Sequence, residues 1–189
     1  MAATLKTLIY QTADYVKADL DDDDDRDILE SRIISGLNEA KNEIARKHYP
    51  LYFTEDIVLD NNGAFSVTDT TRTLYAVENV SQGGVAIPFE QRASMVMCGA
   101  GGGTTVTVKY RYIPADMVNE NDAYVFPDVV DYRILCYRAA QTFYEIKGTA
   151  SSLSKAAVWR SKWNEALRNK LTANDPTVIR DVYYTKSGW

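Results

Sequence analysis

The chain has 189 residues, of which 46% are hydrophobic and 25% charged, and its formal net charge is −5 at pH 7. A chain of this length can bury a real core and form one domain. The negative balance argues against a protein that coats nucleic acid, because phosphate binding needs clustered lysine and arginine, and no apolar run approaches the roughly 20 residues of a membrane span.

Two helices are predicted near the start of the chain. Apolar side chains at three- and four-residue steps predict one helix over residues 4–18 and another over residues 26–48, which Pro50 ends. The polar side chains of the second helix, Lys41 among them, are expected to face water. The first residues, Met1–Lys6, lack the basic and then apolar pattern of a signal peptide.

An acidic run, Asp19–Asp25, lies between these two helices. Such a run suggests calcium, but an EF-hand loop counted from Asp21 would need glycine and glutamate where Arg26 and Arg32 stand. We therefore interpret the run as a solvated turn whose negative charge favours the start of the following helix.

The period changes after the second helix, and residues 51–113 predict a small antiparallel sheet of about five or six strands. Residues 73–80 and 85–89 flank a Gly-Gly turn and predict one hairpin. The clearest alternation in the chain is at residues 105–110, where one face carries Val106, Val108 and Tyr110.

A glycine-rich segment, with Gly99, Gly101, Gly102 and Gly103, separates residues 92–98 from residues 104–112 and predicts a second hairpin. A phosphate-binding P-loop would continue into lysine and a helix, and a dinucleotide loop would place a third glycine at Thr104; neither pattern is met. Two interpretations stay open. The segment is either a flexible hairpin tip that folding does not need, or an assembly loop that becomes ordered against a partner.

Two further helices, over residues 127–147 and 152–171, follow a polar linker at 115–125. Pro127 suits a first helical position, and Asp128 and Asp131 place negative charge in the first turn. Gly148 is expected to end the first helix of this pair. The second helix is expected to begin at a cap formed by Ser151 or Ser152. Its expected apolar stripe consists of Leu153, Ala156, Trp159 or Arg160, Trp163, Leu167 and Leu171.

The residues that could carry chemistry are few. The single histidine, His48, has no nucleophile and no orienting acid at a familiar spacing, and Cys98 and Cys136 are far apart in apolar segments. From the sequence we therefore expect a protein that is not an enzyme and that binds no metal ion and no cofactor. The predicted fold is α+β, a bundle of about four helices with an inserted antiparallel sheet, in one domain over residues 1–171 with an arm at 172–189.

The second half of the chain resembles the small head-to-tail connector, or adaptor, proteins of tailed bacteriophages. The resemblance rests on an alternating strand that ends at Pro114, a polar linker, a proline-led helix from Phe126, Gly148, and the aromatic spacing of Trp159 and Trp163. The acidic turn leading into residues 28–34 resembles the N-terminal helices of the same family.

The resemblance implies a structural virion protein at the neck, assembled in the host cytoplasm. Such adaptors form homo-oligomeric rings of about twelve copies under the portal protein, extend the DNA channel and present a surface for the tail or the next neck ring. DNA would pass through without specific binding. A tail-completion protein or a phage assembly chaperone is the alternative function.

The C-terminal arm is rich in apolar and aromatic residues, which include Ile179, Val182, Tyr183, Tyr184 and Trp189. A free arm that exposed this surface would be a liability, so we expect it to have a partner. It either packs back on its own sheet as an extra strand or, as the resemblance implies, docks the ring onto the portal.

Overall fold

A computed structural model describes residues 3–18, 26–128 and 130–171. Within these residues the predicted class is confirmed, because the protein is α+β with four α-helices and small antiparallel sheets. The chain divides into a helical unit, Met1–Glu43 with Asp116–Trp189, and a β unit, Ile44–Ala115. None of the helices in the described ranges has the length and apolar character needed to cross a membrane.

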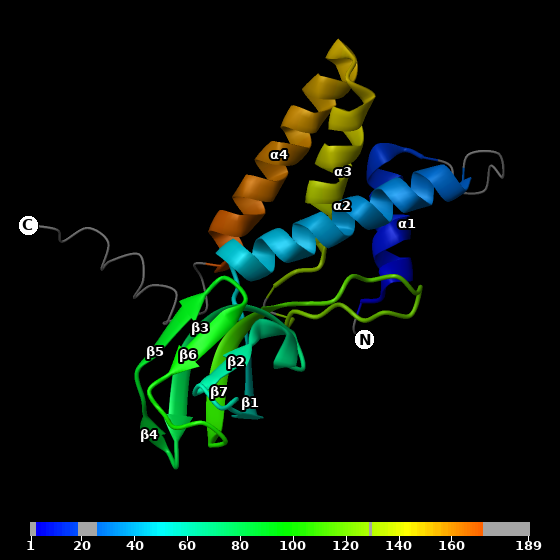
Figure 1. Cartoon of the computed structure of the whole chain (residues 1–189). Coiled ribbons are helices and arrows are strands. Elements are labelled where there is room, and N and C mark those ends of the chain that lie inside the picture. Colours follow the sequence, from blue (N-terminus) through cyan, green and yellow to red (C-terminus); the bar gives the residue numbers. More distant parts are fainter. Residues whose placement is uncertain (1–2, 19–25, 129, 172–189) are drawn as a thin grey trace, which may run out of the picture. The chain divides into compact units, whose positions relative to one another are not determined.

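In the helical unit the two C-terminal helices pack along each other, and the first helix packs along one of them (Figure 1). Their rings meet where Trp159 stacks on Tyr15 and Tyr137, with centroids 4.8 and 5.9 Å away. The Tyr144 hydroxyl also donates a hydrogen bond to the carbonyl oxygen of Val16 at 3.1 Å. These contacts join the antiparallel hairpin of α3 and α4 to the first helix; the four helices are α1 (Leu5–Val16), α2 (Arg26–Lys47), α3 (Arg133–Lys147) and α4 (Ala150–Leu171).

The second helix crosses α3 at a glycine (Figure 1). A Cβ atom added to Gly36 would lie 3.0 Å from the Cα atom of Ala139, so only glycine permits this approach without a shift. Near the crossing, the Arg138 guanidinium lies 3.3 Å from the Glu43 carboxylate. Buried apolar residues of α2 on this side include Ile33, Leu37 and Ala40.

The third helix begins later than the sequence predicts. Its first turn was expected at Pro127, with Asp128 and Asp131 beside it, whereas α3 starts at Arg133. Pro127 instead opens a turn in which the Val130 N–H donates to its carbonyl at 2.9 Å, and the Asp131 carboxylate accepts from the Arg133 N–H at 2.9 Å. Val130 is buried, and its carbonyl accepts a hydrogen bond from the Tyr124 hydroxyl at 2.8 Å, so contacts from outside the turn fix it where local signals favour helix.

The end of α3 is where the sequence predicts it, but the cap of α4 and one residue of its apolar stripe differ from the prediction. Gly148 ends α3 in the left-handed conformation, with φ of 65°. The cap of α4 is Thr149, whose hydroxyl accepts from the Ser152 N–H at 3.2 Å, and not one of the serines that follow. Trp163 is buried as expected, but Leu153 is 50% exposed because the helix buries only one narrow side.

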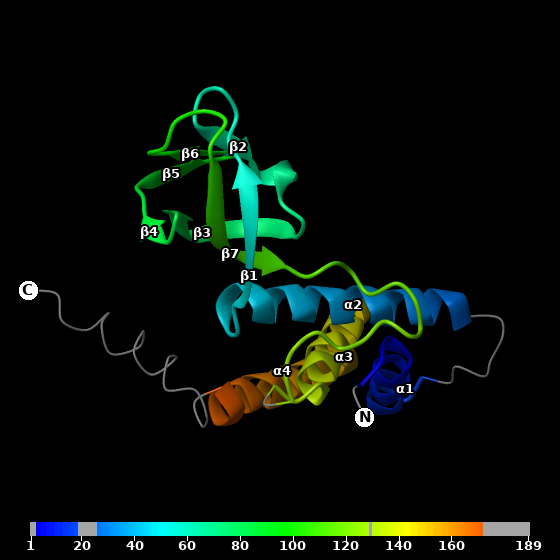
Figure 2. The same cartoon turned by 90° about the horizontal axis from the view of Figure 1, so that it is seen from below.

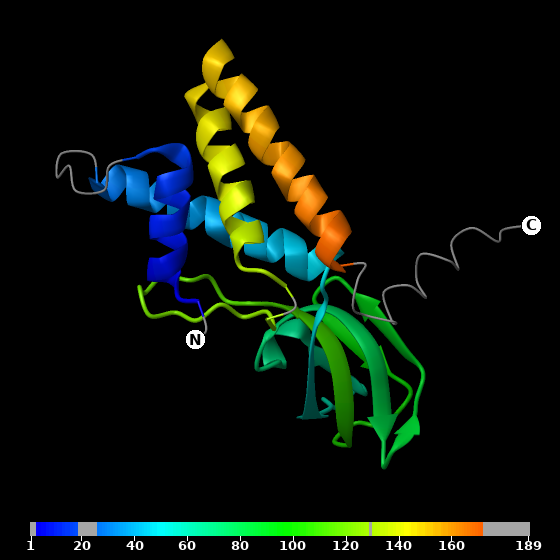
Figure 3. The same ribbon diagram turned by 180° about the vertical axis from the view of Figure 1, so that it is seen from behind.

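The β unit contains two antiparallel sheets in place of the single predicted one (Figure 3). The four-stranded sheet has the order β1-β7-β3-β4 and the three-stranded sheet the order β2-β6-β5. The predicted hairpin after residue 73 is present as β3 and β4, but Phe89 already belongs to the other sheet. The elements are β1 (Leu51–Val58), β2 (Ala64–Ser66), the 3-10 helix η1 (Val67–Asp69), β3 (Thr73–Gln82), β4 (Val85–Ala86), β5 (Phe89–Arg92), β6 (Met95–Cys98) and β7 (Thr105–Ile113).

The core of the β unit lies on the predicted face of β7, which is thereby confirmed. Val106, Val108 and Tyr110 are all buried. The Tyr110 hydroxyl donates to the Glu55 carboxylate at 2.5 Å, and burial is the main cause that raises the pKa of Tyr110 to about 12. Other buried members of this core are Ile57, Leu59, Phe65, Val80 and Val96.

Candidate functional site

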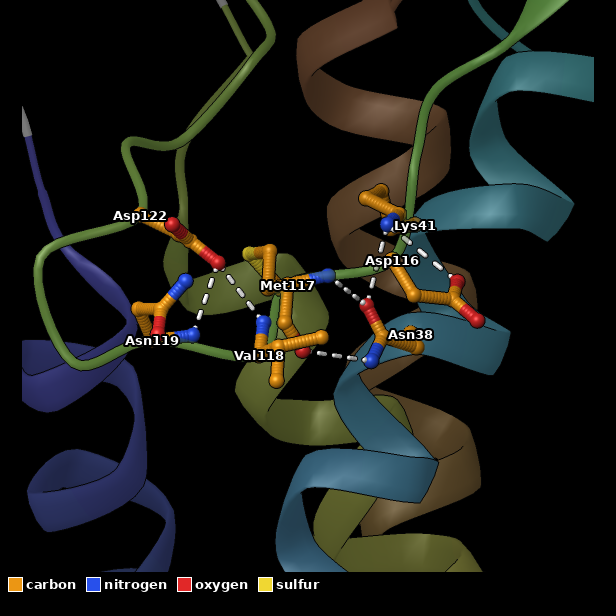
Figure 4. Close-up of polar contacts among 7 residues, drawn as sticks. All are labelled: Asn38, Lys41, Asp116, Met117, Val118, Asn119 and Asp122. Carbon is orange, nitrogen blue, oxygen red and sulfur yellow. Dashed lines mark hydrogen bonds and ion pairs between the residues drawn. The ribbon is translucent and has the colours of Figure 1, made fainter.

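A buried lysine on α2 forms the centre of a polar cluster in the helical unit (Figure 4). The Lys41 side chain is 1% exposed, and its ammonium group donates to the Asn38 side-chain oxygen at 2.9 Å and lies 3.5 Å from the Asp116 carboxylate. Asn38 also bonds to both backbone polar groups of Met117. Its side-chain amide donates to the Met117 carbonyl at 3.0 Å and accepts from the Met117 N–H at 2.8 Å. We call these four residues the Asn38–Lys41 cluster.

The same linker closes on itself and on the N-terminal segment. The Asp122 carboxylate accepts from the N–H groups of Val118 and Asn119 at 2.6 and 2.8 Å, as Figure 4 shows. Its carbonyl accepts from the Leu5 N–H at 2.9 Å, and the Tyr124 N–H donates back to Ala3. These hydrogen bonds hold the polar linker predicted at 115–125 in place within the helical unit. In Figure 3 the linker lies beside the N-terminal end of α1.

The contacts of the Asn38–Lys41 cluster serve structure and not catalysis. Burial lowers the pKa of Lys41, while the Asp116 carboxylate acts in the opposite direction. A lysine of lowered pKa can serve as a nucleophile, but here the amine is held by Asn38 and Asp116. A surface pocket of the same unit is lined by other residues, including Lys6, Tyr10 and Glu30. The contacts of Lys41 thus position the linker.

The expectation that Lys41 faces water is wrong, and the sequence carried a signal against it. Lys41 stands four residues after Leu37 and three before Ile44, both fully buried. Helical periodicity therefore places it on the apolar stripe. What the periodicity could not reveal is the partner, because Asp116 and Met117 are distant in sequence and lie in a segment without a regular pattern.

A second cluster covers the outer face of the four-stranded sheet, opposite the core. The Lys109 ammonium lies 5.0 Å from the centre of the Tyr52 ring, and the guanidinium carbons of Arg46 and Arg111 lie 5.9 and 5.8 Å from the Tyr75 ring. We call these five residues the tyrosine–cation face. Tyr52 and Tyr75 are 51% and 44% exposed, so the face is open to a partner in the β unit taken alone.

Two irregularities in β3 build this face. The register against β7 shifts between Leu74 and Ala76 and again between Val77 and Asn79. The residues at the two shifts are Tyr75 and Glu78, and both contact Arg111, one through its ring and the other through an ion pair at 2.6 Å. Bulges redirect side chains in this way and are frequent at functional positions.

The glycine-rich segment is not the predicted hairpin tip. It leaves β6 of one sheet and enters β7 of the other, so its flanking strands do not pair with each other. The Gly103 N–H donates to the Leu59 carbonyl at 3.1 Å, and the Gly99 N–H donates to the Pro88 carbonyl at 2.8 Å. A Cβ atom on Gly102 would lie 2.6 Å from the Asn61 carbonyl oxygen.

The segment therefore packs its backbone against the turn after β1, beside which it lies in Figure 2. Its predicted residues, Gly99, Gly101, Gly102 and Gly103, nevertheless remain exposed on their outer side. The structure brings these four glycines together as a preformed surface segment. The predicted arm residues, Ile179, Val182, Tyr183, Tyr184 and Trp189, lie outside the described residues.

The residues considered for catalysis or metal binding stay dispersed. His48 follows α2 in a turn, Cys98 is half-buried on β6 and Cys136 is buried in α3, with both thiols free. Burial raises the pKa of Cys136 to about 12 and disfavours its thiolate. Within the described ranges, no three His, Cys, Asp or Glu side chains are grouped so that they could hold a metal ion; the run Asp19–Asp25 lies outside them.

No protein-family model matches the chain, and no curated protein is significantly similar to it.

Proposed function

We propose that the protein is a head-to-tail adaptor of a tailed bacteriophage, a structural virion protein that forms a ring under the portal. The observation that carries the proposal is the order of elements after β7. Pro114 ends an alternating strand, the linker at 115–125 follows, and α3 and α4 form a hairpin closed at Gly148. This is the order on which the resemblance of the sequence to connector proteins rests.

The fixed linker also supports a ring function. A closed ring uses the same heterologous contact repeatedly, so a small rotation in each subunit would accumulate and prevent closure. Asn38 and Asp122 hold the linker by its backbone, and Lys41 fixes Asn38 in turn. The helical unit, in which α3 packs along both α4 and α1, thereby offers neighbouring subunits a rigid body.

Two predicted contact regions are part of the proposal. The C-terminal arm, with Ile179, Val182, Tyr183, Tyr184 and Trp189, docks the ring onto the portal. The glycine-rich segment, Gly99–Gly103, touches a neighbouring subunit, the tail or the next neck ring. It would do so as a preformed surface and not as a loop that becomes ordered, because its backbone is already packed.

The test is the state of assembly with and without isolated portal rings. We expect the purified protein to be monomeric alone and to add about twelve copies to a portal ring, which native mass spectrometry resolves. The protein should also be present in purified virions at the copy number of the portal. A protein that binds during assembly but is absent from finished particles would be an assembly chaperone, and this outcome would reject the adaptor function. A tail-completion protein would instead remain with isolated tails.

A further inference from the structure

The tyrosine–cation face in the β unit carries an excess of positive charge, whereas the chain as a whole is negative. Between Ile44 and Ala115 the sequence has six basic and six acidic residues, so the net charge of −5 comes from the remainder of the chain. On this side of the sheet, Arg46, Lys109 and Arg111 stand against two acids. Glu78 is ion-paired with Arg111, and Asp56 accepts a hydrogen bond from the Thr107 hydroxyl at 2.6 Å. The face is therefore locally positive in an acidic protein.

Two of its cations are available for a ligand. Only Arg111 has an acidic partner there, and the contacts of Lys109 and Arg46 in the described ranges are to the Tyr52 and Tyr75 rings. A ring under a cation fixes the position of the charge and leaves it uncompensated. Both side chains are exposed, so an anion can approach them without displacing a carboxylate.

We propose that the tyrosine–cation face binds the phosphate backbone of duplex DNA. Lys109 and Arg111 are alternate residues of one strand, so their Cα atoms lie about 6.8 Å apart, and two cations at this spacing can contact neighbouring phosphates of one DNA strand. Thr54 and Asn79 pair in register with Lys109 from the two neighbouring strands and supply the neutral donors that commonly accompany phosphate contacts.

The contact carries no sequence information, because contacts to phosphate do not read the base edges. It deepens the proposed function, on which its biological setting rests, by assigning to the DNA the sheet face of the subunit. Passage of DNA through a channel requires contacts that are weak and independent of sequence, and a few phosphate contacts of this kind are both.

The direct test is binding of the full-length protein to a fluorescent duplex of roughly 24 base pairs at low ionic strength, followed by a salt titration. The double variant Arg46→Gln with Lys109→Gln should bind at least tenfold more weakly, and the slope of log K against log salt should fall by about 2. The matched control is Lys155→Gln with Lys162→Gln on α4, since these lysines also lie over rings, those of Tyr144 and Trp159.

The control variant should retain the affinity and the salt slope of the native protein. Equal losses in both double variants, or unchanged binding in the first, would overturn the inference, provided that urea midpoints show each variant folded. Tighter binding of polyglutamate than of DNA would overturn it in favour of an acidic protein partner. Portal-matched copy number without DNA binding rejects this inference alone, whereas DNA binding by a protein absent from virions rejects the adaptor function alone.

Discussion

The side chain of Asn38 makes hydrogen bonds to both backbone polar groups of Met117. Its amide donates to the Met117 carbonyl and accepts from the Met117 N–H, and the oxygen also accepts from the buried Lys41. Removing the amide leaves three polar groups without this partner in a part-buried place. Leaving a buried donor or acceptor unsatisfied costs more than a typical hydrogen bond contributes.

Asn38→Ala should therefore lower the free energy of unfolding by about 2–3 kcal/mol, measured by urea denaturation. The matched control is Asn164→Ala, an exposed asparagine on α4, where the change should stay within about 0.5 kcal/mol. Equal effects at the two positions would show that the cluster does not hold the linker.

Glu55 makes the stability of the β unit depend on pH in the acidic range. Burial would raise the pKa of Glu55, but hydrogen bonds from the Thr71 hydroxyl, the Tyr110 hydroxyl and the Thr71 N–H together hold it below its ordinary value of 4.5. A carboxyl group whose folded pKa is lowered stabilises the fold above its unfolded pKa. That contribution is lost as the pH falls through the folded value.

Glu55→Gln should therefore reduce the loss of thermal stability between about pH 6 and pH 3, because glutamine does not titrate. The native protein should lose more than the variant over this interval in melting experiments followed by circular dichroism. Glu90→Gln is the control, since Glu90 is fully exposed beside Arg92 and its ion pair is screened by solvent. A steeper acid loss in the Glu55 variant would contradict the assignment.

At the scale of elements, the sequence predicts what is local and fails where the partner is distant. Gly148 and the alternation in β7 are read correctly because a helix end and a half-buried strand leave their signals in adjacent residues. The segment Gly99–Gly103 is misread because strands next to each other in sequence commonly pair, and nothing local shows that β6 and β7 join different sheets. The turn after Pro127 fails for the same reason, since a tertiary contact holds it.

The packing of the glycine-rich segment can be tested one methyl group at a time. A Cβ atom on Gly102 would meet three backbone atoms of Asn61 within 2.7 Å, whereas one on Gly101 would find only the Thr104 hydroxyl, at 3.9 Å. Gly102→Ala should cost about 1–3 kcal/mol of unfolding free energy. Gly101→Ala should be neutral or slightly stabilising. If urea midpoints are the same for both, the segment is not held as described.

The α3–α4 hairpin should respond differently on its two sides. Trp163 is 4% exposed, and its replacement by alanine should cost about 3–5 kcal/mol through lost burial and a cavity. Leu153→Ala on the same helix, at a half-exposed position, should cost less than about 1 kcal/mol. Similar losses in urea denaturation would reject Trp163 as a core residue.

At the scale of the whole molecule, the proposed arm separates stability from assembly. A chain truncated after Leu171 keeps both units, and the proposal expects it to melt as the full protein does but to fail to bind isolated portal rings. Twelve or so weak contacts made together can hold a ring that single contacts would not. Loss of folding on truncation would favour an arm that pairs with its own sheet, and retained portal binding would end the docking hypothesis.

The insertion of the β unit also fixes an order of events on the ribosome. The β unit is one continuous stretch, Ile44–Ala115, whereas the helical unit is assembled from stretches on either side of it. At translation speeds of about 5–20 residues per second, the residues from Asp116 to Leu171 take roughly 3–11 s to appear. During that interval α1 and α2 are already synthesised but have no α3 or α4 to cover buried positions such as Leu8 and Leu37. The β unit can therefore fold while the first two helices still need protection, until α3 and α4 have been synthesised.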